Sequence, residues 1–252
     1  MPITTVRRAL DDAVLVPQLL EAVCERASAP RSCMASLQRL STFGLFLLAQ
    51  KRHPGLYAPL MKLLDAAAPE LNDEWLCSRR LRFHAAQIVA AACPDGRRLM
   101  NLAEDPKAQA HIRGAALEAI GLLAAFGDAT RAETVSRLRA LYPMVRRADD
   151  PILDSSWVSI AAKVHWHRLD NELRWFMSSG RLPAGLREVI ADATRQHPDT
   201  NFVAVMALEP PINILVNVFA QEFRDGEVGL VVNKSGPDLS GYLNDSHDTE
   251  RN

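Results

Sequence analysis

Apolar residues recur at helical spacing through most of the chain, and this periodicity most limits what the chain can fold into. Ile112, Ala116, Ala119 and Leu123 follow one another at steps of four, three and four, which places them along one stripe of an α-helix. The segment 81–92 repeats these steps. Pro, Gly or Asp bounds each such segment, and these residues commonly start and stop helices. The pattern predicts an all-α chain.

The periodic segments come in pairs, a long helix followed by a short one, at intervals of about 30–45 residues, as in HEAT-like repeats. Each hairpin has an apolar face that only a neighbouring hairpin can bury. The sequence therefore predicts a HEAT-like α-solenoid of stacked helical hairpins, and a single-domain helical bundle is the alternative. The expected helices run over about 17–23, 36–53, 57–65, 73–92, 99–103, 112–123, 130 onward, 157–164, 173–177 and 186–196.

Local signals support several of these boundaries. Thr130-Arg-Ala-Glu133 is a capping box, in which side chain and backbone satisfy each other at a helix start. Gly127 stands where a helix often ends in a left-handed residue. Asp150-Pro151 is suited to opening a helix, and Asp73 is a candidate N-cap.

The helical pattern of apolar residues ends at about residue 200. We expect residues 1–200 to form the helical stack and residues 201–225 to be an extension of it. Within this extension, residues 201–208 fit a continuation of the last helix pair, and residues 212–223 fit a strand and a short helix equally well. Residues 226–252 are rich in Gly, Ser, Asp and Asn, which predicts a poorly ordered tail.

The composition excludes several classes of protein. The longest segments without Asp, Glu, Lys or Arg, 83–94 and 210–221, fall short of the roughly 20 apolar residues of a membrane span. The first residues contain no secretory h-region. Cys24, Cys33, Cys77 and Cys93 include no C-x-x-C pair, which favours free thiols in the cytoplasm. We expect no membrane segment, no metal and no cofactor.

Two segments resemble a known family. Residues 43–64, FGLFLLAQKRHPGLYAPLMKLL, and residues 105–123, DPKAQAHIRGAALEAIGLL, are similar to the bacterial domain-of-unknown-function 1186 family, and the likeness in element order covers about residues 9–200. The resemblance implies HEAT-like helical hairpins and a bacterial, cytoplasmic setting, and it brings no catalytic residues. Many relatives end in a Cys-rich zinc motif, whereas no Cys follows Cys93 here.

Arginines recur near equivalent points of successive hairpins and are the candidate binding residues. Residues 1–148 contain 20 Lys and Arg against 14 Asp and Glu, and residues 149–252 contain 9 against 16. A ladder of arginines along one face would suit an acidic protein partner, with nucleic acid as the alternative partner. Solvated charges offset by the acidic part of the chain would give the same pattern. The candidates are Arg79, Arg80, Arg82, Arg97, Arg98, Arg137, Arg139, Arg146 and Arg147.

An enzymatic alternative rests on aromatic residues near an acid. DNA glycosylases built on HEAT-like stacks use such groups to hold a cationic base, and Trp157, Trp166, Trp175 and Asp154 fit that description, although they lie in the acidic part of the chain. His165 and His167 are two residues apart, which points their rings about 200° apart on a helix and disfavours shared metal binding. No catalytic signature occurs, so the sequence favours a non-catalytic protein–protein interaction scaffold over a nucleic-acid binder or base-repair enzyme.

Overall fold

The computed structural model describes residues 8, 11–28, 44–45, 47–49, 51–66, 79–165 and 168–195. Within these ranges the regular structure is helical and contains no strand, so the prediction of an all-α chain is confirmed for them. None of the helices in these ranges has the length and apolar character that a membrane span requires. The predicted extension 201–225 and tail 226–252 lie outside the described residues, as do Asp73 and the start of the helix that it was expected to cap.

Backbone contacts divide the chain into two compact units, Met1–Ala66 with Glu209–Asn252, and Ala67–Leu208. In the first unit, α2 (Leu15–Ser28) packs against α4 (Tyr57–Ala66), which follows the short 3-10 helix η2 (Pro54–Leu56). The Asp12 carboxylate accepts hydrogen bonds from two backbone N–H groups at the start of α2. Leu15 and Leu19 of α2 are buried, and so are the three leucines of α4.

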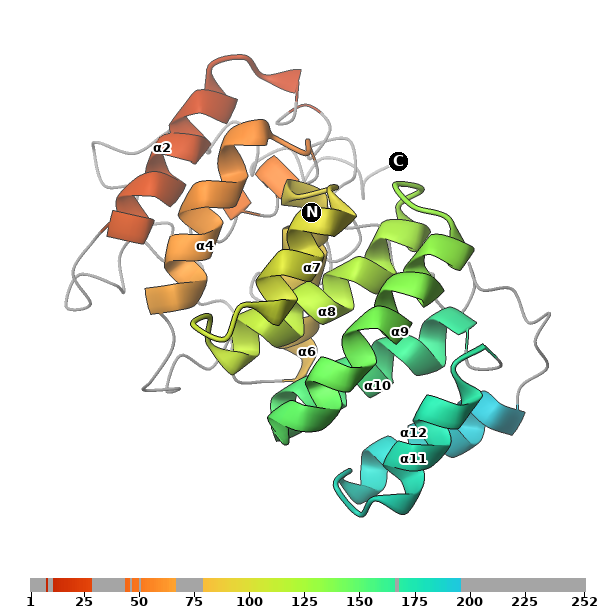
Figure 1. The fold of residues 1–252 in the computed structure, drawn as a ribbon. Helices are drawn as coiled ribbons and strands as arrows, with labels where there is room; N and C mark the ends of the chain where they lie inside the picture. Colours follow the sequence, from red (N-terminus) through yellow and green to blue (C-terminus); the bar gives the residue numbers. More distant parts are fainter. Residues whose placement is uncertain are drawn as a thin grey trace, which may run out of the picture. The chain divides into compact units, whose positions relative to one another are not determined.

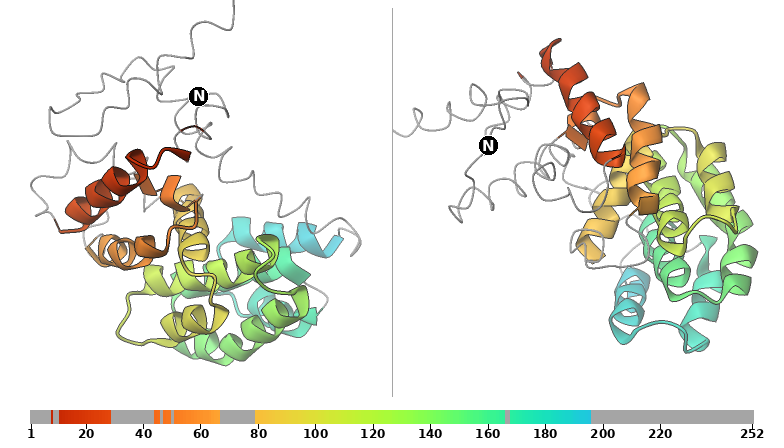
Figure 2. Two further views of the ribbon diagram at one scale, coloured as in Figure 1. Left: turned by 90° about the horizontal axis from the view of Figure 1, so that it is seen from above. Right: turned by 90° about the vertical axis from the view of Figure 1, so that its left-hand side faces the viewer.

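The second unit contains seven described helices: α6 (Arg79–Ala92), α7 (Gly96–Glu104), α8 (Ala110–Ala125), α9 (Arg131–Ala148), α10 (Pro151–His165), α11 (Asp170–Ser178) and α12 (Ala184–Arg195). Helices α6, α8, α10 and α12 pack one on the next, and α7 packs on α9. Further contacts of α8 with α7 and α9, and of α10 with α9 and α11, join these two rows (Figures 1 and 2).

Helix α8 lies at the centre of this unit because nearly all of its sides are apolar. The predicted stripe Ile112, Ala116, Ala119 and Leu123 is buried, and so are other residues around the helix, which lets it contact α6, α7, α9 and α10. Gly114 permits the close approach of α10, since an added Cβ would stand 2.8 Å from the Ser156 Oγ atom. Small residues therefore set the spacing of these helices.

The helix ends follow the sequence signals. The capping box of Thr130 and Glu133 is present, and Gly127 has a φ of 78°. The Asp150 carboxylate accepts hydrogen bonds from the backbone N–H groups of Ile152 and Leu153 at the start of α10. These three predictions are confirmed.

One prediction about helix length is wrong. α9 has 18 residues and α8 has 16, so this hairpin does not consist of a long helix followed by a short one. Helix α9 passes through Pro143, whose side chain is exposed, so the ring meets solvent and not a neighbouring helix. The apolar stripe of Leu138, Leu141 and Val145 continues past the proline and is buried, which keeps the helix intact.

Candidate functional site

The structure places the predicted arginines on three helices. Arg79, Arg80 and Arg82 belong to the first turn of α6, and their side chains lie outside the described part. Arg97 and Arg98 are exposed in the first turn of α7. The other four belong to α9, where Arg137 is half-buried and Arg139, Arg146 and Arg147 are exposed.

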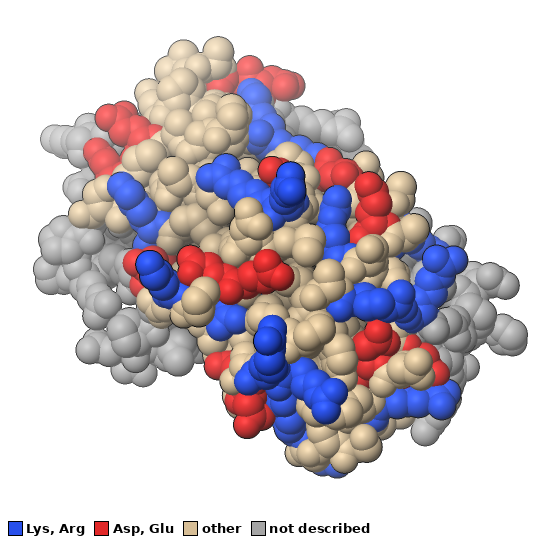
Figure 3. All heavy atoms as spheres, viewed as in Figure 1, with Lys and Arg blue, Asp and Glu red and all other residues tan. Residues whose placement is uncertain are grey.

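The α9 arginines point in different directions. Arg137 and Arg139 are two residues apart, or about 200° around the helix, whereas Arg139 and Arg146 are seven apart and share a side. Arg137 faces the start of α7 and Arg139 bonds to the segment of α11. On the face drawn in Figure 3, blue basic and red acidic side chains are interleaved. The arginines whose side chains the structure describes therefore form two groups on this unit.

The first group surrounds the start of α7. The Asp95 Oδ1 atom caps the helix by accepting hydrogen bonds from the backbone N–H groups of Arg97 (2.9 Å) and Arg98 (3.4 Å). The Arg137 guanidinium lies against Gly96, since a Cβ added there would stand 2.5 Å from Nη1 and 2.6 Å from Cζ. The Arg137 Nη1 atom is buried and has no hydrogen-bond partner among the described residues. We call Arg97, Arg98 and Arg137, with Gly96 between them, the Gly96 cluster.

Glu133, one turn before Arg137, is occupied by the capping box. Its Oε2 atom accepts hydrogen bonds from the Thr130 backbone N–H (2.8 Å) and the Thr130 Oγ1 atom (2.9 Å). These bonds lower the pKa of Glu133 below its ordinary value, and the charge of Arg137 acts in the same direction more weakly. Its principal contact is therefore the helix cap.

The second group connects α9 with α10 and the segment around α11. The Arg139 guanidinium donates to Glu172 Oε1 at 3.1 Å and to the carbonyl of Arg168. The Arg147 Nε atom donates to the carbonyl of Pro143 in its own helix.

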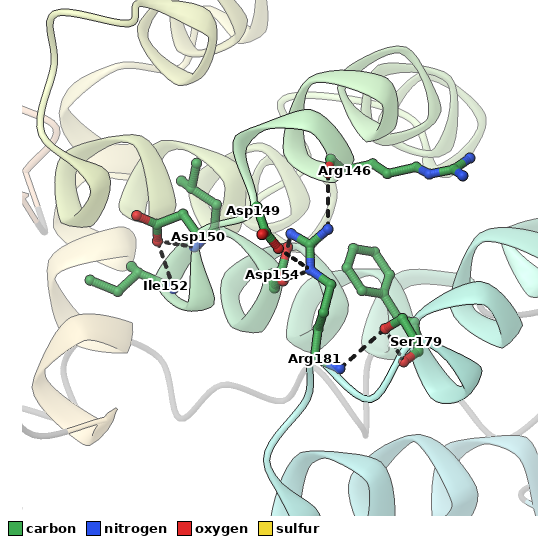
Figure 4. A network of polar contacts seen from close by, with 9 residues as sticks. Arg146, Asp149, Asp150, Ile152, Asp154, Ser179 and Arg181 are labelled. Carbon is green, nitrogen blue, oxygen red and sulfur yellow. Dashed lines mark hydrogen bonds and ion pairs between the residues drawn. The ribbon is translucent and has the colours of Figure 1, made fainter.

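At the centre of this second group, Arg181 binds Asp154 through two hydrogen bonds. Arg181 Nε and Nη2 donate to the two carboxylate oxygens of Asp154 at 2.8 and 2.9 Å, and Arg181 Nη1 donates to the Arg146 carbonyl at 2.9 Å (Figure 4). The exposed Asp149 carboxylate lies 3.0 Å from Nε. Asp154 is only 2% exposed. We call Arg181, Asp154 and Asp149 the Arg181 clasp, because it joins the α11–α12 connection to the start of α10 and the end of α9.

Burial and hydrogen bonding act in opposite directions on Asp154. Desolvation raises the pKa of the Asp154 carboxyl, whereas the hydrogen bonds and charge of Arg181 lower it; the net shift is upward. A carboxylate in such a place needs its partner, because an unpaired buried charge is strongly unfavourable. Asp154 is therefore part of the packing of this unit.

A cluster of aromatic rings lies beside the clasp, which it meets at Trp175. Tyr142 and Phe176 each contact both Trp157 and Trp175 as well as each other, with ring centroids 5.0–6.1 Å apart. The guanidinium groups of Arg146 and Arg181 lie 4.6 and 5.4 Å from the Trp175 centroid. Burial raises the pKa of the Tyr142 hydroxyl.

The structure thus brings together three residues of the enzymatic alternative. Trp157 is completely buried, and its Nε1 atom donates to the Leu138 carbonyl. Asp154 is held by Arg181, and Trp175 is half-buried beneath two arginines. Trp166 and His167 lie outside the described residues. Asp154 and Trp157 are therefore committed to contacts inside the protein.

Sequence reasoning missed Arg181 and Arg113. Arg113 on α8 donates from Nε to the Ala103 carbonyl at the end of α7 and from Nη2 to Met144 Sδ on α9, both at 2.9 Å. A signal for the clasp was present: Asp154 shares the apolar stripe of its helix with Trp157 and Ala161, and a carboxylate there requires a cation. The identity of that cation depends on tertiary structure.

Among the described residues, no group of three or more His, Cys, Asp and Glu side chains lies close enough together to hold a metal ion. Cys24 is exposed, Cys93 is buried, and both are free thiols. The chain matches no family model, and the searches detected no similarity to a curated protein or to a solved structure.

Proposed function

We propose that this chain is a HEAT-like stack of helical hairpins similar to the bacterial domain-of-unknown-function 1186 family. In this proposal it serves as a non-catalytic scaffold for an acidic protein partner. The succession of packed helices from α6 to α12 supports the repeat assignment. A stack of this type offers side chains from successive hairpins to a partner.

The observation that carries the proposal is the exposure of arginines on helices fixed by packing. Arg97 and Arg98 stand on α7, and Arg146 and Arg147 on α9, and both helices pack against α8. A side chain on a packed helix loses less conformational entropy on binding than one on a free segment. Guanidinium groups bind carboxylates through two parallel hydrogen bonds, so an acidic protein is the partner that this surface fits.

On the face drawn in Figure 3, the interleaving of acidic and basic side chains favours a protein over nucleic acid as the partner of that face. A phosphate backbone presents closely spaced negative charges along its whole length and is met by a continuous basic surface. The burial of Asp154 and Trp157 gives the base-repair alternative no support.

Affinity capture from a bacterial lysate, followed by mass spectrometry, tests the proposal. We expect an acidic protein to be retained and to be released by salt. Capture should be lost when Arg97, Arg98, Arg146 and Arg147 are all changed to Ala.

The matched control changes four other exposed basic residues, Arg8, Lys51, Lys107 and Arg187, to Ala and removes the same charge. Equal capture by both variants would contradict the proposal. Retention that nuclease treatment abolishes would favour the nucleic-acid alternative instead.

A further inference from the structure

The Arg137 guanidinium occupies the space that a side chain at position 96 would fill. Gly96 is buried at the first position of α7, and an added Cβ would meet three atoms of the guanidinium of Arg137, at 2.5, 2.6 and 3.0 Å. No other residue type leaves this space open. The glycine therefore lets a cation from α9 fold back against α7.

Arg137 is poorly hydrogen-bonded in this position. Its Nη1 atom is buried without an acceptor among the described residues, and a buried donor without a partner is unfavourable, more so on a charged group. Asp95, which precedes Gly96, caps α7, and Glu133, one turn before Arg137, caps α9. The start of α7 is also the positive end of its dipole. An arginine so placed has no Nη1 hydrogen bond to break when it leaves.

We infer that the Gly96 cluster is an anchor for an aspartate or glutamate side chain of the acidic partner, and that Arg137 swings out from Gly96 to bind it. The inference rests on the proposed function and names the residues that carry it. Arg97, exposed beside Gly96, supplies the second guanidinium. Binding gives the Arg137 Nη1 donor the acceptor that it lacks at rest, and a charge-assisted hydrogen bond to carboxylate is among the stronger ones.

The contrast with Arg181 supports this assignment. Arg181 Nε, Nη1 and Nη2 all donate to carboxylate or carbonyl oxygens within the protein. Turning outward would break these hydrogen bonds. Among the described residues, Arg137 carries a buried guanidinium nitrogen, Nη1, that has no hydrogen-bond partner. A partner's carboxylate would accept hydrogen bonds from Arg137 as the Asp154 carboxylate does from Arg181.

Two substitutions with opposite expected effects test the inference. The probe is a fluorescein-labelled decaglutamate peptide, titrated with the full-length chain at low salt and followed by fluorescence anisotropy. Arg137→Ala should weaken peptide binding about tenfold, because the charge-assisted bonds are lost. Gly96→Ala should leave binding intact or tighten it, because the added methyl group displaces Arg137 from its resting place before the peptide arrives.

Circular dichroism and thermal unfolding of each variant show whether it is folded. Arg137→Lys keeps the charge without the planar fork and should fall between wild type and Arg137→Ala. Arg187→Ala, an exposed arginine of α12, is the matched control and should bind as wild type does.

The outcomes separate this inference from the proposed function. If Arg97→Ala with Arg98→Ala weakens binding while folded Arg137 variants bind like wild type, the arginine surface stands and the Arg137 anchor is overturned. Loss of binding in folded Gly96→Ala would overturn the outward swing. If the wild-type chain binds no decaglutamate, or binds an oligothymidylate in preference to it, both proposals fail.

Discussion

Arg181 and Arg137 are both partly buried between helices of the second unit, yet their surroundings differ. The Arg181 guanidinium is bound by Asp154, Asp149 and a backbone carbonyl, whereas Arg137 lies against Gly96 with a buried nitrogen that lacks an acceptor. Burial of a cation therefore does not by itself show its role. The partners of its N–H groups distinguish a residue that holds helices together from one that is available to another molecule.

The largest expected effect follows from removing Arg181. Arg181→Met leaves the Asp154 carboxylate buried without a cation, and we expect a loss of about 3–5 kcal/mol in the free energy of unfolding. Urea denaturation followed by circular dichroism measures this loss. A change as small as that of the exposed control Arg187→Met would show that Asp154 is solvated and that the clasp contributes little.

A second substitution tests whether the unpaired Asp154 carboxylate causes the loss of stability in Arg181→Met. Because the loss comes from an orphaned charge, Asp154→Leu in the Arg181→Met background should recover most of it and bring the double variant to within about 2 kcal/mol of wild type. The same urea experiment, read as a double-mutant cycle, gives the coupling between the two residues. Additive losses would mean that the two side chains act independently.

Arg137→Met should have the opposite sign to Arg181→Met. The substitution keeps an unbranched chain over Gly96 and removes a donor without an acceptor, so the free energy of unfolding should stay unchanged or rise by about 1 kcal/mol. Thermal and urea unfolding provide the measurement. A loss of unfolding free energy comparable with that of Arg181→Met would show that Arg137 also holds the helices together.

The smallest effect concerns pH. The pKa of Glu133 is lowered in the folded protein, first by its hydrogen bonds to Thr130, so its ionised form stabilises the fold above the ordinary pKa of Glu. That contribution disappears as the pH falls through the lowered pKa. Glu133→Gln should therefore be less stable than wild type at neutral pH and equal to it in acid. Unfolding curves at several pH values measure the difference, and a gap that is independent of pH would show that the cap does not depend on this charge.

The local features of the fold were predictable because they depend on neighbouring residues. The capping box at Thr130, the left-handed Gly127 and the central stripe of α8 all follow from spacings of a few residues. The length of α9 was not predictable from local signals, because Pro143 removes a backbone hydrogen bond and so disfavours a continuous helix, whereas the buried stripe of Leu138, Leu141 and Val145 continues past it.

The candidate site also has features that the sequence predicts and others that depend on tertiary structure. Arginine positions on α7 and α9 were visible in the sequence, and the two-residue spacing of Arg137 and Arg139 already implies opposite sides of a helix. The pairing of Arg181 with Asp154 joins residues 27 apart, and the contact of Arg137 with Gly96 joins two helices. Such pairings arise from the packing of α10 and α9 against their neighbours, which no local pattern encodes.

Asp149 ends α9 in the left-handed conformation, with φ 50° and ψ 42°, while its carboxylate, 78% exposed, lies beside Arg181. A residue with a Cβ is less stable there than glycine by roughly 1–2 kcal/mol, and an exposed ion pair returns about 0–1 kcal/mol. The ion pair therefore offsets only part of the cost of the left-handed backbone. Glycine at position 149 would cost the fold little, because the buried Asp154 carboxylate still holds Arg181 through two hydrogen bonds.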